Sequence, residues 1–519
     1  MLDDASAIAT DTPIEADICI IGGGAAGITV AREFIGTPHK VILLEGGGME
    51  IDAATQDLYR GTNVGRSYYD LDACRLRYFG GSTNHWGGWC HPLSPIDFRK
   101  RPWIPHSGWP IDYDDLAPFY GRAGKVVQLP HSRFDEAHLL RTHPDTRAFP
   151  FDPAVLHPEC YQFSPPTRFG EVYGPALKKA PNISVVLNAN VVAIERDPGG
   201  SAIRSVRYAT LGGKRRAVRA KTFILATGGI ENARMLLVSN IGNDHDLVGR
   251  FFMDHPEPIG GMVMLIDPRD PRWVPFVQSH PERADDRAPL GCVGISVARQ
   301  ARERINNVRV GFHYLPVMHS EGMTALQQLL TREETTTALP QASVGENLLH
   351  IVSDVEGLSR EAIDRVSHGK PMLQMIEVEV YGQQAPNPDS RVTLGDERDA
   401  LGVPRLKMDW RLSDFDRHSA DRTLRLLAQE LGRIGLGRMK LAFKDWGPDF
   451  YYGNHHMGTT RMSDDPRTGV VDADCRVHGV PNLYVAGSSV FTTSGNATPT
   501  LTIVALALRL ADHLKAKHG

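Results

Sequence analysis

The stretch Asp17-Ile-Cys-Ile-Ile-Gly22-Gly-Gly24-Ala-Ala-Gly27 decides the fold of this chain. Its first five residues read as a short buried strand, and residues 28–34 after the glycines read as a helix. Residues 40–45 add a second apolar run. A strand, a glycine turn, a helix and another strand within about thirty residues predict a βαβ unit.

The glycines Gly22, Gly24 and Gly27 have the spacing of a dinucleotide-binding fingerprint. They permit a tight turn, a close approach of the backbone to a pyrophosphate, and close packing of the helix on the strand. Glu45 follows Gly22 by 23 residues, at the end of the second strand, where a carboxylate can accept hydrogen bonds from ribose hydroxyls. An ordinary glycine turn is the alternative, and the glycines alone do not separate FAD from NAD.

The composition is that of a folded globular protein. The chain has 519 residues, of which 41% are hydrophobic and 23% charged, and its formal net charge is −4. Without a basic excess to bind a phosphate backbone, no nucleic-acid partner is expected. The six cysteines form no CxxC pair, and no cluster of Cys, His, Asp or Glu has ligand spacing, so no metal site is predicted.

The two ends of the sequence have no membrane signal. The N-terminal stretch is acidic and lacks the apolar core of a signal peptide. Residues 501–510, the longest apolar run, are too few to span a bilayer and include Arg509. We therefore expect a cytoplasmic protein with no membrane partner and an unknown oligomeric state.

Between these ends the patterning changes along the chain. Residues 1–15 read as a loose polar tail, and residues 46–125 are rich in Gly, Tyr, Trp and Pro with little periodicity. Residues 183–225 alternate like antiparallel strands, and a helix is expected at 231–238. Further strands are predicted at 261–266, 308–314, 373–380 and 481–486, and further helices at 346–366, 413–434 and 501–514.

Several motifs in a fixed order resemble those of the glucose–methanol–choline (GMC) flavin oxidoreductases. The matching stretches are Ile20-Ile-Gly-Gly-Gly-Ala-Ala-Gly27, Gly80-Gly-Ser-Thr-Asn-His-Trp-Gly-Gly88, Leu225-Ala-Thr-Gly-Gly-Ile-Glu-Asn-Ala-Arg234, Val248-Gly-Arg-Phe-Phe-Met-Asp-His255, His455-His-Met-Gly-Thr-Thr-Arg-Met462 and Thr498-Pro-Thr-Leu-Thr502. They run nearly end to end. Within the family, the chain looks most similar to the pyranose 2-oxidase-like branch and to bacterial sugar and glycoside oxidases.

The resemblance implies an α/β fold with two domains. A Rossmann-like FAD-binding domain of the GMC type would be discontinuous and comprise residues 1–125, 180–255 and 452–519. A substrate-binding domain, built on a β-sheet with flanking helices, would comprise residues 126–179 and 256–451.

The resemblance implies that the cofactor is FAD. It also implies which residues contact each part of the FAD molecule. The residues are Gly22, Gly24, Gly27 and Glu45 for the ADP half, Gly81, Ser82, Asn84 and His85 for the isoalloxazine, Val191 for the adenine, Thr227, Gly228 and Arg234 for the second flavin-side segment, Gly487 and Ser488 for the diphosphate or ribityl region, and Thr500 for the pyrimidine end.

His85 matches the histidine that carries covalent flavin in fungal pyranose oxidases. An imidazole nitrogen can add to the 8α carbon of the flavin, but Asn84 before it and Gly87-Gly88 after Trp86 depart from that pattern. We expect noncovalent FAD. Covalent attachment through His85 is one alternative, and a loop histidine that bonds only backbone is another.

The resemblance assigns catalysis to His455, the first histidine of the His-x-x-Gly-Thr motif. Oxidation of an alcohol removes the hydroxyl proton while a hydride leaves carbon, and a neutral imidazole is the usual base. His456 competes for the role, but the register of the following Gly-Thr pair favours His455. The family's partner residue, a second His or an Asn before the last helix, falls at Thr498, which is a departure; Asn496 is the alternative partner.

The remaining candidates have ordinary structural explanations beside functional ones. His255 is expected to stabilise a domain junction, His313 and Tyr314 to face either a ligand or the core, and Trp89 to pack or to stack on a sugar ring. A Gly-x-Ser-x-Gly nucleophile elbow is missing from the sequence, so a hydrolase is not supported.

The function we expect is FAD-dependent oxidation of an alcohol, namely a sugar, glycoside or related polyol. His455 would take the hydroxyl proton, flavin N5 would take the hydride, and oxygen or another electron acceptor would complete the cycle. One alternative is an NAD-linked dehydrogenase with the same fingerprint. Another, suggested by Thr498, is a flavoprotein with a specialised biosynthetic or non-redox role.

Overall fold

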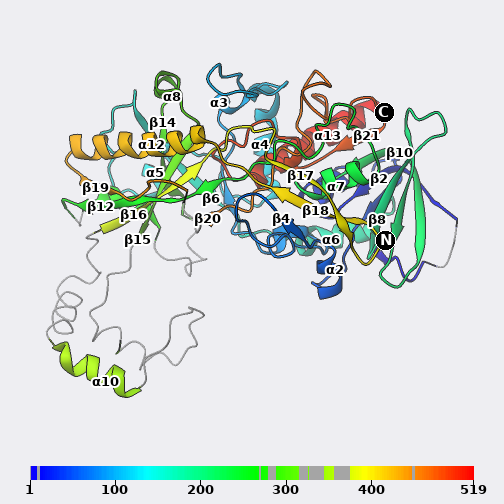
Figure 1. Cartoon of the computed structure of the whole chain (residues 1–519), viewed down its shortest axis with the longest axis horizontal. Coiled ribbons are helices and arrows are strands. Elements are labelled where there is room, and N and C mark those ends of the chain that lie inside the picture. Colours follow the sequence, from blue (N-terminus) through cyan, green and yellow to red (C-terminus); the bar gives the residue numbers. More distant parts are fainter. Residues whose placement is uncertain are drawn as a thin grey trace.

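The computed structural model describes residues 2–8, 12–267, 270–278, 288–314, 325, 344–355, 375–446 and 451–518. These residues are arranged around two large sheets that lie side by side, and both ends of the chain lie beside the first of them (Figure 1).

The first sheet is built on the predicted βαβ unit. Strand β2 (Ile14–Ile21) leads through the glycine turn into helix α1 (Ala25–Glu33) and then β3 (Val41–Leu44), and the two strands pair in parallel. The last four residues of β2 and all of β3 are buried, as expected for strands that are covered on both faces. A Cβ on Gly27 would lie 1.9 Å from the Gly22 carbonyl oxygen, so this close packing of helix on strand requires glycine.

The strand order of this sheet is β1-β7-β3-β2-β10-β9-β8, with β21 beside β10. The other strands are β1 (Leu2–Asp4), β7 (Ile183–Leu187), β8 (Asn190–Arg196), β9 (Ile203–Ala209), β10 (Arg215–Leu225) and β21 (Leu483–Val485). The predicted antiparallel pattern is confirmed for β8, β9 and the first half of β10, whereas β7 and the rest of β10 pair in parallel with β3 and β2. The predicted tail at 1–15 is wrong, because β1 extends the sheet and Ala5 is fully buried.

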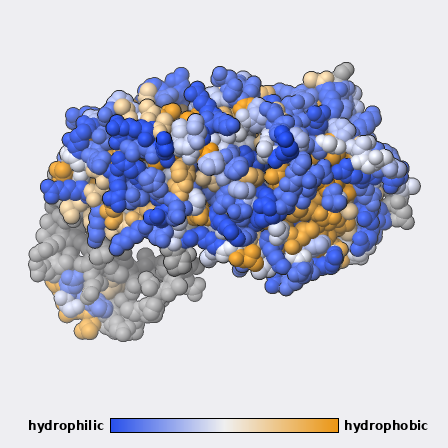
Figure 2. Space-filling model, turned by 45° about the horizontal axis from the view of Figure 1, so that its top comes forward, coloured by the Kyte–Doolittle hydropathy of each residue, from blue (hydrophilic) through white to orange (hydrophobic). Residues whose placement is uncertain are grey.

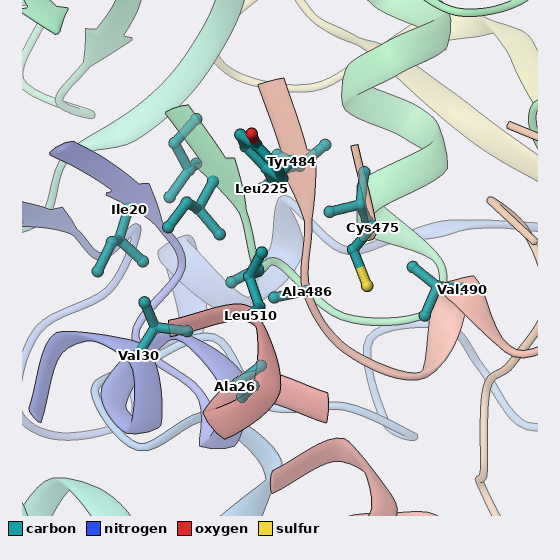
Figure 3. Packing of buried hydrophobic residues seen from close by; sticks show 14 of the residues in the cluster. Ile20, Ala26, Val30, Leu225, Cys475, Tyr484, Ala486, Val490 and Leu510 are labelled. Carbon is teal, nitrogen blue, oxygen red and sulfur yellow. The ribbon is translucent and has the colours of Figure 1, made fainter. Parts of the chain in front are cut away.

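Several helices pack around this sheet. Helix α13 (Thr500–His518) lies against α1 and α4 (Tyr113–Val126), while α6 (Phe169–Lys179) lies against α1 and β7. Figure 3 shows Val30 of α1 and Leu510 of α13 gathered with Ile20 of β2 and Leu225 of β10. Helix α4 lies within the stretch in which little periodicity was predicted; its start is fixed by a capping box between Asp112 and Asp115.

The second sheet has the order β19-β12-β16-β15-β14-β6-β5, with β13 beside β15. Its strands are β5 (Trp89–Cys90), β6 (Leu156–Phe163), β12 (Ile259–Leu265), β13 (Val277–Gln278), β14 (Leu290–Ile295), β15 (Val308–Tyr314), β16 (Met375–Gly382) and β19 (Gly437–Leu441). Helix α12 (Asp414–Arg433) lies along one face of this sheet (Figure 1) and has the predicted cap at Ser413.

The alternation of side chains along β16 gives the second sheet two different faces. Ile376, Val378 and Val380 are buried in the core that includes Leu424 and Leu427 of α12. Because side chains of a strand alternate, Glu377, Glu379 and Tyr381 lie on the opposite face. Glu379 and Tyr381 of this polar face line a cavity together with residues that follow β2 and β3 of the first sheet.

Smaller elements connect the two sheets. A third sheet joins β4 (Gly61–Asn63) to the pair β17 (Arg391–Arg398) and β18 (Pro404–Asp409), and β11 (Pro256–Glu257) pairs with β20 (Tyr451–Tyr452). The short helices are α2 (Ala53–Asp57), η1 (Gly81–Asn84), α3 (Pro95–Phe98), α5 (Glu136–Thr142), α7 (Glu231–Val238), η2 (Pro271–Trp273), α8 (Val297–Glu303), α10 (Val344–Ser353) and η3 (Ser488–Val490). Of the helix predicted at 346–366, residues 356–366 lie outside the described residues.

Two segments contact the part of the fold other than the domain predicted for them, and the domain bounds stay a prediction. Residues 89–90 form β5 of the second sheet, although 1–125 were expected in the FAD-binding domain. Conversely, α6 packs against α1, although 126–179 were expected in the substrate-binding domain.

The surface and the cysteines agree with a folded globular protein. Most of the face in Figure 2 is hydrophilic, and its apolar residues gather in separate patches. All six cysteines are buried and unpaired. Within the described ranges, no helix combines the length and the apolar character needed to cross a membrane, and no group of three His, Cys, Asp or Glu side chains is arranged to hold a metal ion.

Candidate active site

A cavity of about 620 Å³ is lined by residues of both sheets. One end lies at the carboxyl ends of β2, β3 and β10, where ligands of open α/β sheets bind. The other end is walled by the polar face of the second sheet. The residues predicted for the site that line it are Gly22, Gly24, Glu45, Gly81, Ser82, His85, Val191, Thr227, Gly228, His455, Gly487, Ser488, Asn496, Thr498 and Thr500.

Bare backbone from three chain segments faces the first end of the cavity. Gly24, Gly228 and Gly487 line it, and a Cβ on Gly24 or Gly228 would meet no heavy atom within 4 Å. A Cβ on Gly487 would meet only the Asn232 amide nitrogen, at 4.0 Å. Any side chain at these positions would therefore enter the space that a bound ligand needs. Gly22 has another role, since its φ is +106° and a Cβ there would lie 2.4 Å from the Ala226 carbonyl oxygen.

The Glu45 carboxylate fixes the loops around this cradle. Its two oxygens accept hydrogen bonds from the backbone N–H groups of Gly23 and Gly47, each at 2.8 Å. Burial raises the pKa of Glu45, and the bonds from these backbone groups act against that rise. Glu45 thus lines the cavity while its position is set by the glycine turn itself.

Two histidines meet at the other end of the cavity. His455 Nδ1 lies 3.0 Å from His255 Nδ1, and both residues line the cavity. His255 Nε2 lies 3.0 Å from the Gly495 carbonyl oxygen and 3.3 Å from that of Ser494. Gly453 makes room for the pair, because a Cβ there would lie 2.2 Å from His455 Nδ1.

The carboxylate of Asp254 holds the backbone of both histidines. Its Oδ1 accepts from the N–H of His255 at 2.7 Å and from the N–H of His455 at 2.8 Å. Tyr68 donates its hydroxyl to the other oxygen. Burial raises the pKa of Asp254 to about 6, and these hydrogen bonds oppose that rise.

The histidines here are neutral at neutral pH. Burial lowers the pKa of His255 to about 4 and that of His456 to about 3. Burial, assisted by His255 and His456, also holds the pKa of His455 well below its ordinary value. His456 packs its ring near Phe252 and Tyr68, so it belongs to an aromatic cluster while His455 is paired with His255.

Two carboxylates also line the cavity, those of Glu379 and Glu257. Glu379 Oε2 lies 2.6 Å from His313 Nε2, and the Tyr381 hydroxyl lies 3.3 Å from the same nitrogen. Glu257, on β11, also lines the cavity, and no partner for its carboxylate occurs in the described part of the chain. Burial, and then the nearby carboxylates Glu379 and Asp254, raise the pKa of Glu257 well above its usual range.

Neither predicted partner of His455 contacts it. Thr498 donates its hydroxyl to the Trp89 carbonyl oxygen at 2.8 Å, and the Asn496 amide donates to Asn307 Oδ1 at 3.1 Å. Both residues line the cavity, but the side chain that touches His455 is His255.

Three of the predicted cofactor residues do not line the cavity. Gly27 is used in helix packing, and Asn84 donates its amide to the Phe79 carbonyl oxygen at 3.0 Å. Arg234 is buried in ion pairs with Glu231 at 2.9 Å and Asp399 at 2.7 Å, and of these three residues Glu231 alone lines the cavity.

Sequence reasoning did not select His255, Glu257, Glu379 or Tyr381 for the site. A signal for Glu379 was present: the run Ile376-Glu-Val-Glu-Val380 alternates apolar and acidic residues, which predicts a strand with one charged face. Only the pairing of β16 within the second sheet turns that face toward His455. His313 lines the cavity, which agrees with the expectation that it faces a ligand and not the core. The side chain of Tyr314 lies outside the described part of the chain.

The comparison with known families decides the cofactor. A profile of FAD dependent oxidoreductases matches residues 17–290, more than half of the chain, and a GMC oxidoreductase profile matches residues 386–507. The chain belongs to the FAD-dependent GMC oxidoreductases. The family assignment favours FAD over the NAD alternative.

Individual relatives of this GMC oxidoreductase are distant but cover it almost completely. The fructose dehydrogenase large subunit of Gluconobacter japonicus is 24% identical, with 96% of this chain and 97% of the relative aligned. The 6'''-hydroxyparomomycin C oxidase of Streptomyces lividus is also 24% identical, over 96% of this chain and 92% of the relative. The crystal structure of pyridoxine 4-oxidase from Mesorbium loti shares the fold, with a TM-score of 0.56, 16% identity and coverage of 97% and 100%.

The residues of this oxidoreductase fit FAD. The three glycines at one end leave open space where a diphosphate needs backbone contact, and the α1 N-terminus is directed to that space. Glu45 lies beside the glycine turn, and its sequence separation from Gly22 is the one expected of a residue that contacts the ribose. The same cavity continues to the histidine pair, so a bound flavin and an alcohol substrate can share it.

Proposed function

We propose that this GMC oxidoreductase oxidises a hydroxyl group of a sugar, glycoside or related polyol, with His455 as the base. The observation that carries the proposal is one continuous cavity with a glycine cradle at one end and His455 at the other. Relatives named fructose dehydrogenase and 6'''-hydroxyparomomycin C oxidase support a hydroxyl-rich substrate.

The residues divide the work by their chemistry. When FAD is bound, it supplies the acceptor for the hydride that leaves the carbinol carbon. His455, neutral because of its burial, takes the proton of the reacting hydroxyl. Glu257, Glu379 and Tyr381, which line the same cavity, offer oxygen atoms to the other hydroxyls and so orient the reacting carbon.

The cofactor is proposed to be noncovalent, and the final electron acceptor to be oxygen or a second acceptor. His85 lines the cavity, so it is the residue to test for attachment. Acid precipitation of the purified enzyme should release the yellow colour into the supernatant. Colour that stays in the pellet, and moves to the supernatant in His85→Ala, would establish attachment at His85 instead.

The test of the proposed function is anaerobic flavin reduction. Mixing the enzyme with a panel of neutral sugars, amino sugars and glycosides should bleach the flavin with at least one of them. His455→Asn should slow the bleaching by about 10²–10⁴-fold at unchanged FAD content, because a general base contributes on that order. An enzyme that contains FAD and is bleached by none of the panel would favour the specialised or non-redox alternative.

A further inference from the structure

We propose that His255 is a positioning residue that determines which ring nitrogen of His455 is free to accept a proton. The inference rests on the proposed role of His455 as the base. It concerns a contact between two chain segments, since the residues are 200 positions apart in the sequence.

The backbone next to His255 fixes its tautomer. His255 Nε2 is within hydrogen-bond distance of two carbonyl oxygens, those of Gly495 at 3.0 Å and Ser494 at 3.3 Å. A carbonyl oxygen only accepts, so Nε2 of His255 carries the hydrogen. In a neutral imidazole the other nitrogen then has a lone pair, and burial keeps this ring neutral by lowering its pKa to about 4.

The lone pair on His255 Nδ1 in turn fixes the tautomer of His455. The two Nδ1 atoms are 3.0 Å apart, and one of them must donate. Because His255 Nδ1 can only accept, His455 Nδ1 carries the hydrogen and His455 Nε2 has the lone pair. In the described residues no group bonds to His455 Nε2, and the ring lines the cavity, so the basic nitrogen is the one that is open to a substrate.

The backbone holds this arrangement rigidly. Met253 and Met457 form a two-bond antiparallel bridge, with both N···O distances at 3.0 Å. Asp254, the next residue, accepts from the N–H of both histidines. The other charged or titratable groups acting on the pair are His456, whose ring is neutral, and Arg309, which also lowers the pKa of His255.

The arrangement of the two rings determines where the substrate proton goes during the reaction. The substrate hydroxyl proton moves to His455 Nε2, which makes this ring an imidazolium. His455 Nδ1 still donates to His255 Nδ1, and that bond becomes charge-assisted and therefore stronger. His255 itself stays neutral and gains no proton, so it acts through His455 and not on the substrate.

The direct test is ¹⁵N NMR of the holoenzyme with labelled histidine, which distinguishes protonated from bare ring nitrogens. We expect His255 to be protonated at Nε2 and His455 at Nδ1, with His255→Phe and His455→Phe used to assign the signals. A His455 ring protonated at Nε2 in the resting enzyme would overturn the inference. This readout does not depend on any substrate, so it stands even if the proposed function fails.

The kinetic test compares two substitutions at His255 in enzyme of equal FAD content. His255→Phe keeps the ring but removes the acceptor, and it should slow flavin reduction about 10- to 100-fold, as loss of a supporting hydrogen bond does. His255→Asn retains an acceptor oxygen near the position of Nδ1 and should recover most of the rate. The matched control is His138→Phe, a buried histidine on α5 away from the cavity, which should reduce at the wild-type rate.

The outcomes separate the two proposals. If wild-type enzyme is reduced by a sugar but His255→Phe is equally fast, the positioning role is wrong and the proposed function stands. If His255→Phe and His255→Asn are equally slow, His255 has only a packing role. If no sugar reduces wild-type enzyme, the proposed function fails, and the NMR result alone decides the tautomers.

Discussion

Glu257 is a carboxyl group that is costly to ionise in the folded protein. It lines the cavity with no partner in the described ranges, and burial together with Glu379 and Asp254 raises its pKa. A buried carboxyl group without a partner is unfavourable in the free enzyme. A ligand hydroxyl or ammonium group bound beside it would supply the missing hydrogen bond or opposite charge. Its cost to the free enzyme has a definite dependence on pH.

We expect Glu257→Gln to be more stable than wild type at pH 8 and equally stable near pH 4.5. Between these values the unfolded chain releases the Glu257 proton while the folded chain keeps it. Wild type therefore loses about 1.4 kcal/mol of unfolding free energy per pH unit until the raised pKa is reached. Urea unfolding of the holoenzyme at several pH values measures the difference.

The control for this series is Glu397→Gln. Glu397 is exposed on β17, so its substitution should leave the pH dependence unchanged. A Glu257→Gln variant that matches wild type at every pH would show that Glu257 is not buried as a neutral acid. In that case the carboxylate has a partner or is hydrated in solution.

At the scale of single residues, the structure also shows what Thr498 does at the position where the family has a second His or an Asn. Thr498 turns its hydroxyl to the Trp89 carbonyl oxygen and does not reach His455. The side chain beside His455 is instead that of His255, a residue expected from the sequence to stabilise a domain junction. The residue at the family's partner position thus bonds to backbone, and His255 occupies the place beside His455.

At the scale of elements, the β2–turn–α1 unit makes a prediction for FAD affinity. Gly24 has an ordinary φ of −87°, and a Cβ there would meet no protein atom within 4 Å. Gly24→Ala should therefore fold normally, but its methyl group enters the space of the diphosphate. We expect the Kd for FAD to rise about tenfold, which is about 1.4 kcal/mol, in fluorescence titrations of FAD-depleted enzyme.

The matched control changes a glycine at which an added Cβ has equally free space but which lies outside the cradle. Gly121 lies exposed on α4, and a Cβ there also meets nothing within 4 Å. Gly121→Ala should leave the Kd unchanged and stabilise the helix by about 0.5–1 kcal/mol. Equal FAD affinity in both variants would mean that the diphosphate does not lie against the Gly24 turn.

At the scale of the whole molecule, Arg234 links regions that are far apart in sequence. Its guanidinium pairs with Glu231 and Asp399 and donates to the carbonyl oxygens of Leu58 and Pro404. It thereby ties α7 of the FAD side to the β17–β18 pair. Only 3% of the side chain is exposed, so removal of the cation leaves the Asp399 carboxylate buried without its partner.

Arg234→Met should lower the free energy of unfolding by about 3–5 kcal/mol, the usual cost of a broken buried ion pair. Folded protein should still bind one FAD per chain, because Arg234 does not line the cavity. Chemical denaturation and the flavin-to-protein ratio measure the two effects. Arg425→Met is the control, since its pair with Asp421 is exposed and should be worth less than about 1 kcal/mol.

A loss of FAD from folded Arg234→Met, with little change in stability, would contradict this role and favour the cofactor contact predicted from the sequence. The double variant Arg234→Met/Asp399→Asn sharpens the test. It removes the stranded charge and should regain part of the lost stability.

The sequence by itself determined the parts of this protein that are encoded locally. The βαβ unit, its glycine turn and α7 are written in contiguous runs, because strand burial, turn geometry and helix periodicity depend on near neighbours. The part of the cradle around Gly24 follows, since Gly22, Gly24 and Glu45 lie within one unit, whereas Gly228 and Gly487 reach the cradle from other segments. The cap of α12 at Ser413 is local in the same sense.

Only the tertiary structure decided the end of the cavity that holds the two histidines. His255 and His455 are brought together by the bridge between Met253 and Met457, which no local pattern announces. Glu379 faces the cavity because β16 pairs with β12 and β15 and turns its apolar side to α12. Arg234 is the last residue of one of the family motifs, but its partner Asp399 comes from a distant hairpin and neither residue lines the cavity. Contacts between distant segments depend on how whole elements pack, and no short stretch of residues specifies that packing.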